Sequence, residues 1–355
     1  MKKLLSLALI VVMCLSLFGG CADSSERQTV KTVVFTDGCG REVNVPASIT
    51  RVAPSGSTAQ MILLTLAPEL LVGLSSTPDE AQLPYLPENF ATLPAFGQFY
   101  GSKANLNMEA LIAAKPDVII DLGDAKEGIG EDMDGIQSQT GIPTVFIEAN
   151  LSDLAQAYRT LGRLLHLEER AEELAVFVEK TLTMAAEKSS AIAESERKTV
   201  LFGTGADGLS CNAAGSVQAD AIDIIGAVNA VQTEEVSNRN GGTLVDLELV
   251  YTLDPDVIIL TDDGPYETLP DSEWSELTAV RNGSYYEIPS LPYNWMCMPP
   301  SVNRVIGIWW LGKVVYPDVY DHDMVAVAQE FYELFWHYTL TDAEAEEMLA
   351  HSTMK

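Results

Sequence analysis

The sequence has few basic residues: 21 lysines and arginines stand against 51 aspartates and glutamates in 355 residues, and the formal net charge is −30. A surface with this excess of negative charge repels nucleic-acid phosphates and anionic lipid head groups. We therefore expect no nucleic-acid partner and no attachment of the folded body to a membrane surface. The chain is still expected to fold, because 47% of its residues are hydrophobic and gather in apolar runs.

Histidine and cysteine are scarce as well, with four and five residues. The histidines are scattered and no Cys-x-x-Cys pair occurs, so the pattern of a zinc site is missing. The sequence also lacks the G-x-S-x-G, H-E-x-x-H and P-loop motifs. We therefore expect a binding protein without catalytic residues, a metal of its own or a cofactor.

One glycine pattern, GTGADG at residues 203–208, matches the dinucleotide fingerprint G-x-G-x-x-G. That fingerprint requires the glycines to open a helix directly. Here LSCN follows at residues 209–212, and a helical pattern begins only near Val217. We therefore reject nucleotide binding and keep Asp207 as a candidate ligand contact.

The apolar run from Leu4 to Phe18 is shorter than the roughly 20 residues that span a bilayer. Two lysines precede it and Gly19-Gly20-Cys21 follows, which is the layout of a secretory signal. Cys21 after two glycines resembles the lipobox of bacterial lipoproteins, in which that cysteine is acylated. We expect residues 1–20 to be a lipoprotein signal peptide and residues 21–31 a tether. An ordinary signal peptide with an incidental cysteine is the alternative.

Short β-rich runs alternate with helical patterns along the rest of the chain, which predicts an α/β fold with mainly parallel sheets. The stretch 152–196 contains no proline and only one glycine, Gly162, and its apolar residues recur every three or four positions. It predicts one long helix, or two with a break near His166–Glu168. We therefore expect an N-terminal lobe at 32–151, a connecting helix at 152–196, and a C-terminal lobe at 197–355 with a helical extension. The expected strands are Thr32–Phe35, Glu42–Val45, Arg51–Ala53, Leu71–Leu74, Val118–Asp121, Thr144–Glu148, Thr199–Phe202, Val257–Leu260 and Tyr285–Ile288.

An internal repeat links the two halves. Residues 107–120 read NMEALIAAKPDVII and residues 246–259 read DLELVYTLDPDVII. In each copy the residue before proline should end a helix, and a buried parallel strand should follow. Glu109 and Glu248 occupy equivalent positions, so they predict one carboxylate per lobe for a partner with pseudo-two-fold symmetry. Ordinary solvated helix carboxylates are the alternative.

The order and spacing of these segments resemble the substrate-binding lipoproteins of bacterial ABC importers for ferric siderophores, haem and cobalamin. The resemblance implies two lobes joined by a backbone helix, with the ligand held between them. It also implies that Glu109 and Glu248 dock onto a permease dimer that works with ATPase subunits, and we expect the receptor to be a monomer. The matching segments are FTDGCGREVNVP, ITRVAP, LVGLSS, NMEALIAAKPDVII, GIPTVFIE, GAVNAV, DLELVYTLDPDVII and PPSVNRVIGIWWLGKVVYP.

Candidate ligand contacts follow the strands, because ligands of open α/β sheets bind at the carboxyl ends of strands. Serine can cap a helix N-terminus, loop aromatics can stack on a chelate, and arginine can hold an anion. Of the two arginines in this set, Arg239 is favoured over Arg304, which could instead anchor its helix. A structural cap and local packing are the alternatives for the serine and for the aromatics. The expected contacts are Ser57, Tyr100, Asp124, Asp207, Arg239, Tyr293, Asn294, Trp295 and Arg304.

The expected function is therefore that of an extracytoplasmic receptor, attached to the bacterial cell membrane through its N-terminal lipid, that delivers an iron complex to an ABC permease. A ferric siderophore-like chelate is the favoured ligand. Cobalamin, haem and molybdate or tungstate are alternatives for the same role. A secreted metal-handling or enzymatic lipoprotein is the alternative from another class.

Overall fold

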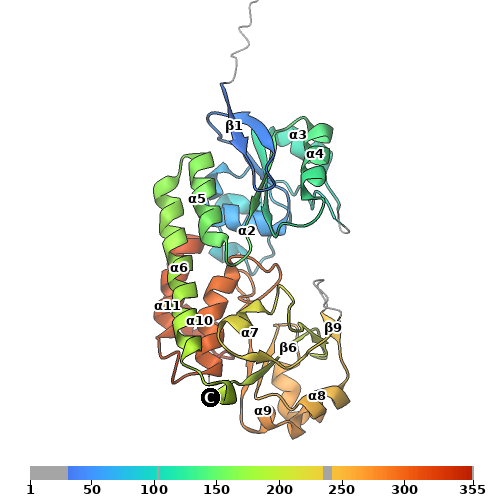
Figure 1. Cartoon of the computed structure of the whole chain (residues 1–355), viewed down its shortest axis with the longest axis vertical. Coiled ribbons are helices and arrows are strands. Elements are labelled where there is room, and N and C mark those ends of the chain that lie inside the picture. The colour runs from blue at the N-terminus through green and yellow to red at the C-terminus, as the bar shows by residue number, and fades with distance from the viewer. Residues whose placement is uncertain (1–30, 102–103, 235–241, 354–355) are drawn as a thin grey trace, which may run out of the picture.

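The computed structural model describes residues 31–101, 104–234 and 242–353. The predicted signal segment 1–20, Cys21 and Arg239 lie outside these described residues. Two lobes follow one another along the long axis, and α6 (Glu168–Ser190) runs along one side of both (Figure 1). Within the described ranges, no helix combines the length and the apolar character needed to cross a bilayer.

The N-terminal lobe is built on a parallel sheet of three strands in the order β3-β4-β5, and a separate antiparallel hairpin, β1 with β2, precedes it. The strands are β1 (Thr32–Thr36), β2 (Glu42–Pro46), β3 (Val52–Pro54), β4 (Val118–Gly123) and β5 (Thr144–Glu148). The helices are α2 (Ser57–Leu66), α3 (Met108–Ala114), α4 (Ile129–Thr140) and α5 (Leu154–Leu165), with 3-10 turns at Pro68–Leu70, Leu83–Tyr85 and Glu88–Ala91.

The C-terminal lobe contains the strand order β11-β10-β6, paired in parallel, which β7 and β9 extend as antiparallel strands. Its strands are β6 (Thr199–Thr204), β7 (Ser210–Cys211), β8 (Val228–Asn229), β9 (Thr243–Leu244), β10 (Val257–Leu260) and β11 (Tyr285–Glu287). Its helices are α7 (Asp220–Ile224), α8 (Leu247–Leu253), α9 (Thr278–Arg281), α10 (Asn303–Val315), α11 (Met324–Phe331) and α12 (Asp342–Met348). A π-helical turn covers Tyr332–Trp336, and 3-10 turns cover Glu194–Glu196, Tyr266–Asp271 and Glu273–Glu276. Two α/β lobes with mainly parallel sheets confirm the predicted fold class.

The internal repeat folds into the same helix–strand unit in both lobes. The side chain of Asn107 accepts a hydrogen bond from a backbone N–H in the first turn of α3, and Asp246 does the same for α8. Each helix ends in a left-handed residue, Lys115 with φ 49° and Asp254 with φ 34°. A proline and then a buried strand follow, as the repeat predicts.

The aspartate of each Pro-Asp-Val-Ile-Ile copy has a structural role. Asp117 Oδ2 accepts hydrogen bonds from the backbone N–H (2.8 Å) and the hydroxyl (3.1 Å) of Thr50. Asp256 Oδ2 accepts the same pair from Thr199 at 2.7 and 2.9 Å. Each aspartate therefore ties its strand to the start of the neighbouring strand in the sheet, which explains why both copies retain it.

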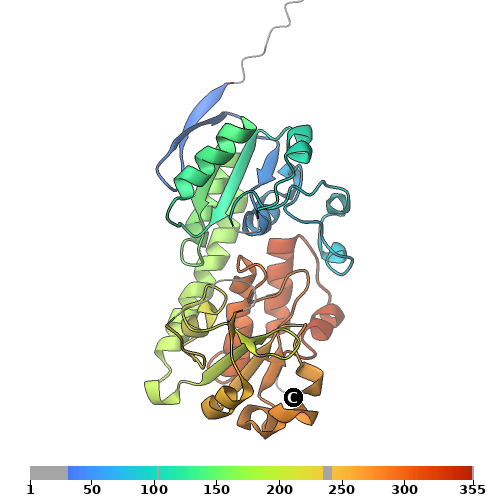
Figure 2. The same cartoon turned by 90° about the vertical axis from the view of Figure 1, so that its right-hand side faces the viewer.

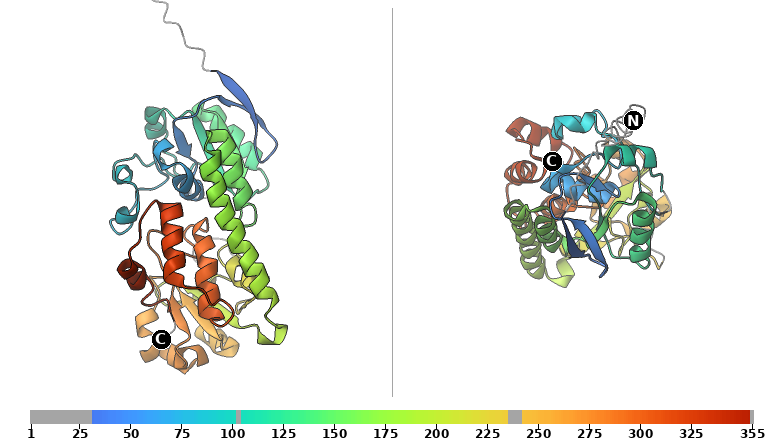
Figure 3. Two further views of the ribbon diagram at one scale, coloured as in Figure 1. Left: turned by 90° about the vertical axis from the view of Figure 1, so that its left-hand side faces the viewer. Right: turned by 90° about the horizontal axis from the view of Figure 1, so that it is seen from above.

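The stretch predicted to connect the lobes is two helices rather than one. α5 ends at Leu165 and is capped by His166, a left-handed residue with φ 59°, and α6 begins at Glu168. A Cβ added to Gly162 would lie 2.5 Å from the Cβ of Ala171, so this glycine allows the two helices to pack closely. α5 lies beside the upper part of α6, and α6 alone continues along the second lobe (Figure 3).

Two other local predictions meet different outcomes. Leu71–Leu74 is not a continuous strand: single bridges join Leu71 to Val52 and Leu74 to Ala95, with a bend at Val72 between them. The GTGADG segment runs from β6 through a turn into the antiparallel strand β7. A strand follows these glycines where a dinucleotide site requires a helix, so the rejection of that site is confirmed.

The core continues from the lobes into α10, which is buried on nearly all sides. The indole N–H groups of Trp309 and Trp310 donate hydrogen bonds to Thr181 Oγ1 and to the carbonyl of Ser352, both at 2.8 Å. α10 is thereby joined to α6 and to the C-terminal end of the chain. The cysteines of the described residues (Cys39, Cys211 and Cys297) are free thiols.

His322 packs edge-on against Trp309, and burial, followed by the charge of Lys313, lowers its pKa to about 4 from 6.5. The unfolded chain binds a proton on this histidine at a higher pH than the native chain does. We therefore expect the free energy of unfolding to fall as the pH drops from 6.5 toward 4. His322→Gln should flatten this part of the pH profile, measured as urea-unfolding midpoints.

The comparison variant is His351→Gln, at a histidine 46% exposed that lies 3.3 Å from Glu267 and 3.4 Å from Glu287. Because these carboxylates favour a charged histidine, this variant should not flatten the profile between pH 6.5 and 4. An unchanged profile in His322→Gln would assign the acid sensitivity to other groups.

Candidate ligand-binding site and docking residues

The carboxyl ends of the strands lie at the boundary between the lobes. In Figure 2 the strands of the upper lobe run toward the lower lobe. The start of α2, which follows β3, reaches the other lobe, where Ser301 Oγ donates to the carbonyl of Thr58 at 3.5 Å. Burial raises the pKa of Asp220 in the second lobe, Arg304 opposes this rise, and the charge of Asp124, which follows β4 in the first lobe, adds to it. A ligand held between these loops would contact both lobes.

On the first lobe, a buried carboxylate lies at the centre of this region. Asp121, 3% exposed and near the end of β4, accepts hydrogen bonds from Ser55 Oγ and from Tyr100 Oη, the latter at 2.7 Å. Burial raises the pKa of Asp121, and the two donors oppose that rise. Ser55 holds the carboxylate of Asp121, and the hydrogen bond to that carboxylate fixes the hydroxyl end of the half-buried Tyr100 ring.

A cation lies over the same tyrosine. The ammonium nitrogen of Lys126 is 4.1 Å from the centroid of the Tyr100 ring and forms an ion pair with Asp132 at 3.0 Å. Its side chain is 46% exposed, so it reaches solvent at the boundary. Tyr100 and Lys126 together offer a ligand an aromatic face and a positive charge.

Arg304, predicted as a contact to an anionic ligand, already has partners within the protein. Its side chain is 3% exposed, its Nη1 forms an ion pair with Asp220, and the same nitrogen donates to the carbonyl of Val217 at 2.9 Å. These partners belong to the second lobe. Arg304 therefore anchors α10 to α7, and its prediction as a ligand contact is corrected.

Of three further predicted contacts, two have structural roles and the third lacks the predicted one. Ser57 is the first residue of α2, where Gly56 is the N-cap and no side chain provides a capping hydrogen bond, so the predicted serine cap is wrong. Trp295 is 1% exposed and donates its indole N–H to Tyr332 Oη at 3.3 Å. Asn294 is 4% exposed, and its Oδ1 accepts from the backbone N–H groups of Met296 and Cys297. Trp295 and Asn294 hold the shape of their loop rather than presenting a face to a ligand.

Tyr293 links the lobes. Gln60 Nε2 on α2 donates to its hydroxyl at 3.4 Å, and beside it Gln82 Nε2 donates to the carbonyl of Pro292 at 2.8 Å. Burial raises the pKa of Tyr293 to about 12. The hydroxyl is therefore neutral at physiological pH, and its hydrogen bond with Gln60 joins the second lobe to α2 of the first.

The two predicted aspartates lie in different places. Asp124 is exposed at the boundary. Asp207 Oδ1 accepts the backbone N–H of Leu209 at 3.0 Å, and its side chain lines a shallow groove with Leu247 and Trp274 near α8. Of the predicted ligand contacts within the described residues, the structure thus brings Tyr100, Asp124 and Tyr293 to the inter-lobe boundary with polar groups available.

Glu109 and Glu248 are the second residues of α3 and α8, and both are exposed. The two helices lie on the side of the molecule opposite α6, one in each lobe (Figure 1). Neither carboxylate has an ion-pair partner among the residues that the structure describes. The positions predicted to be equivalent are equivalent in structure.

Residues 92–292 match the periplasmic binding protein family. A solved ABC transporter solute-binding protein from Sulfurospirillum deleyianum is 27% identical, with a TM-score of 0.82 over 89% of this chain and 99% of that chain. The molybdate-binding MolA of Haemophilus influenzae shares the fold at 20% identity, with a TM-score of 0.68 over 87% and 99% of the two chains. An uncharacterised ABC transporter substrate-binding lipoprotein of Bacillus subtilis, YvrC, is 23% identical over 224 residues, 61% of this chain and 67% of that protein.

Proposed function

Since this chain belongs to the periplasmic binding protein family, as a solute-binding protein of an ABC transporter that works outside the cytoplasm, we propose that it is a lipid-anchored receptor for an iron complex. It holds a ferric siderophore-like chelate between its lobes and delivers it to a permease dimer driven by ATPase subunits. Acylation of Cys21 keeps the receptor at the membrane, and Glu109 and Glu248 dock it onto the permease.

The observation that carries the ligand proposal is the Tyr100 platform, defined as Tyr100 with Asp121, Ser55 and Lys126. A tyrosine ring fixed by a buried carboxylate and covered by an ammonium group presents a rigid aromatic surface with one cation beside it. Such a surface suits a bulky organic chelate with delocalised negative charge. It offers little to a small ion that needs several donors converging on one point.

Molybdate is the ligand of the Haemophilus relative, and it is the alternative that the charges disfavour. Exposed Asp124, Asp262 and Asp263 follow β4 and β10. Lys126 is already paired with Asp132, and Arg304 with Asp220. A small oxyanion would concentrate its charge among these carboxylates, whereas a large chelate spreads its charge and also gains from contact with the aromatic ring. Haem and cobalamin remain alternatives because both are large and carry flat organic surfaces.

The test is a thermal-shift and calorimetry screen of the purified protein against ferric catecholate and hydroxamate siderophores, haem, cobalamin and molybdate. A ligand at one hundred times its dissociation constant stabilises the native state by about 2.7 kcal/mol. We expect a ferric chelate to give this stabilisation and Tyr100→Ala to weaken its binding about tenfold. The matched control Tyr251→Ala, at a tyrosine 40% exposed on α8, should bind like the wild type.

Stabilisation by molybdate, haem or cobalamin, and not by a ferric chelate, would replace the proposed ligand. Equal affinity in Tyr100→Ala and the wild type would remove the platform from the binding site. Either result leaves the transport role of the family intact.

A further inference from the structure

A second surface lies on α6 and α11, away from the docking helices (Figure 3). A groove of about 1000 Å³ runs there between α6 on one side and α11 with the π-helical turn Tyr332–Trp336 on the other. Neither the proposed ligand contacts nor Glu109 and Glu248 belong to its lining.

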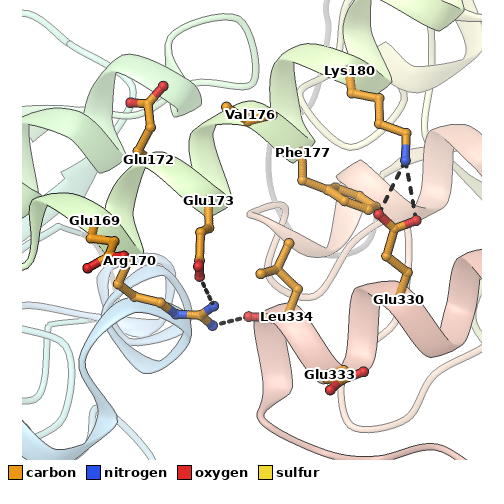
Figure 4. A pocket seen from close by; sticks show the side chains of 10 residues that line it. All are labelled: Glu169, Arg170, Glu172, Glu173, Val176, Phe177, Lys180, Glu330, Glu333 and Leu334. Carbon is orange, nitrogen blue, oxygen red and sulfur yellow. Dashed lines mark hydrogen bonds and ion pairs between the residues drawn. The ribbon is translucent and has the colours of Figure 1, made fainter.

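The centre of this groove is apolar. Figure 4 shows Val176, Phe177 and Leu334 between the two helical walls. Val176 is 50% exposed on α6, and the half-buried Leu334 extends from the π-helical turn toward α6 beside the buried Phe177. Together these side chains give the groove an apolar lining bordered by polar residues, which is the layout of an interaction site.

The border of the groove is acidic. Its lining contains five glutamates against two basic side chains. The ion pairs Arg170–Glu173 (3.1 Å) and Lys180–Glu330 (3.2 Å) use both basic side chains. Glu169 and Glu333 have no ion-pair partner in the described part of the chain, so the border keeps unpaired negative charge beside an apolar centre.

The dimensions of the groove suit a short helix. From Glu169 to Lys180 the wall formed by α6 covers three turns, about 16 Å. An amphipathic helix of that length can place two or three apolar residues over Val176 and Leu334 while basic residues on its flanks reach the glutamates. A second copy of this chain is a poor occupant because each copy carries a net charge of −30.

We propose that this groove binds a basic amphipathic helix of a partner protein. The binding combines burial of the apolar centre with the attraction of the unpaired glutamates, so it requires both a stripe of apolar residues and flanking lysines or arginines. The site is independent of the proposed ligand and of permease docking, because it shares no residue with either.

The test uses a fluorescein-labelled synthetic peptide of leucine and lysine, with leucines at helical spacing i, i+3, i+4 and i+7, and measures its fluorescence anisotropy with the full-length mature protein. We expect micromolar binding that weakens as salt is raised. Val176→Asp should weaken it at least tenfold, and so should the double variant Glu169→Lys with Glu333→Lys. The matched control, Glu187→Lys with Glu194→Lys, makes the same change of charge at exposed glutamates outside the groove and should bind within twofold of the wild type.

A peptide of the same composition with its leucines scrambled should bind at least tenfold more weakly. Equal binding of the scrambled peptide, or an equal loss in the control double variant, would show only general attraction to an acidic protein and would overturn the proposal. Wild-type binding by Val176→Asp, with the folded state verified by circular dichroism, would overturn it as well.

Discussion

Replacing both Glu109 and Glu248 by arginine is expected to abolish uptake of the ligand while its affinity for the receptor stays unchanged. Both carboxylates are exposed at the starts of α3 and α8, one in each lobe, and both lie outside the proposed ligand-binding region. Removing one partner of a buried, hydrogen-bonded charge pair at a protein interface costs about 2–5 kcal/mol, and like charges add repulsion. Loss of two such contacts should reduce uptake more than a hundredfold in proteoliposomes that contain the permease and its ATPase.

The matched control is Glu131→Arg with Glu273→Arg, which changes the charge by the same amount at exposed positions, again one per lobe. This pair should retain uptake within twofold of the wild type. If the Glu109 and Glu248 variant transports as the wild type does, the two glutamates are ordinary solvated carboxylates. A loss of ligand affinity in that variant would instead place them near the binding site.

The second large effect is expected on stability. Asp220→Ala leaves the guanidinium of Arg304, which is 3% exposed, without its carboxylate partner. Leaving a buried charge uncompensated costs about 3–5 kcal/mol. The lower half of that range is expected, because the side chain of Asp220 is 32% exposed and because the carbonyl of Val217 still accepts from Arg304. The free energy of unfolding from urea titrations measures the loss.

Two further variants decide whether the cause is the unpaired charge. The double variant Asp220→Ala with Arg304→Met removes both charges and should regain more than half of the lost stability. Asp321→Ala breaks an exposed pair with Lys188, in which Asp321 is 78% exposed, and should leave the free energy of unfolding nearly unchanged. A loss in Asp220→Ala no larger than that of Asp321→Ala would contradict a structural role for the Arg304–Asp220 pair.

The sequence predicted the elements whose signals are local. Each Pro-Asp-Val-Ile-Ile copy combines a helix stop with a fully apolar strand, so both β4 and β10 fall where expected. For 152–196 the sequence allows either one helix or two, because the break between α5 and α6 depends on the close approach of Gly162 to Ala171 across the helical hairpin. Leu71–Leu74 has the apolar content of a strand. Its restriction to two single bridges depends on tertiary contacts that the sequence pattern does not show.

The binding region was harder to predict than the fold. The strand-end rule points to loops that lie at the inter-lobe boundary, but it indicates Ser57, whereas Ser55 makes the contact with Asp121. In the sequence, Asp121 lies in the pattern of a buried strand, and nothing in that pattern predicts that two hydroxyl groups donate to its carboxylate. Arg304 and Trp295 carry the chemistry of ligand contacts, but the partners that occupy them, Asp220 and Tyr332, are distant in the sequence.

The 23 residues of α6 extend for about 35 Å and hold the two lobes at a set separation. The proposed docking residues are therefore the two ends of a rigid bivalent ligand for the permease. Once one glutamate has bound the permease, the other is held near its own binding site at a high effective concentration. Little orientational entropy then remains to be lost. Avidity of this kind depends on the match in spacing, so a change in the length of α6 should weaken docking even with both glutamates intact.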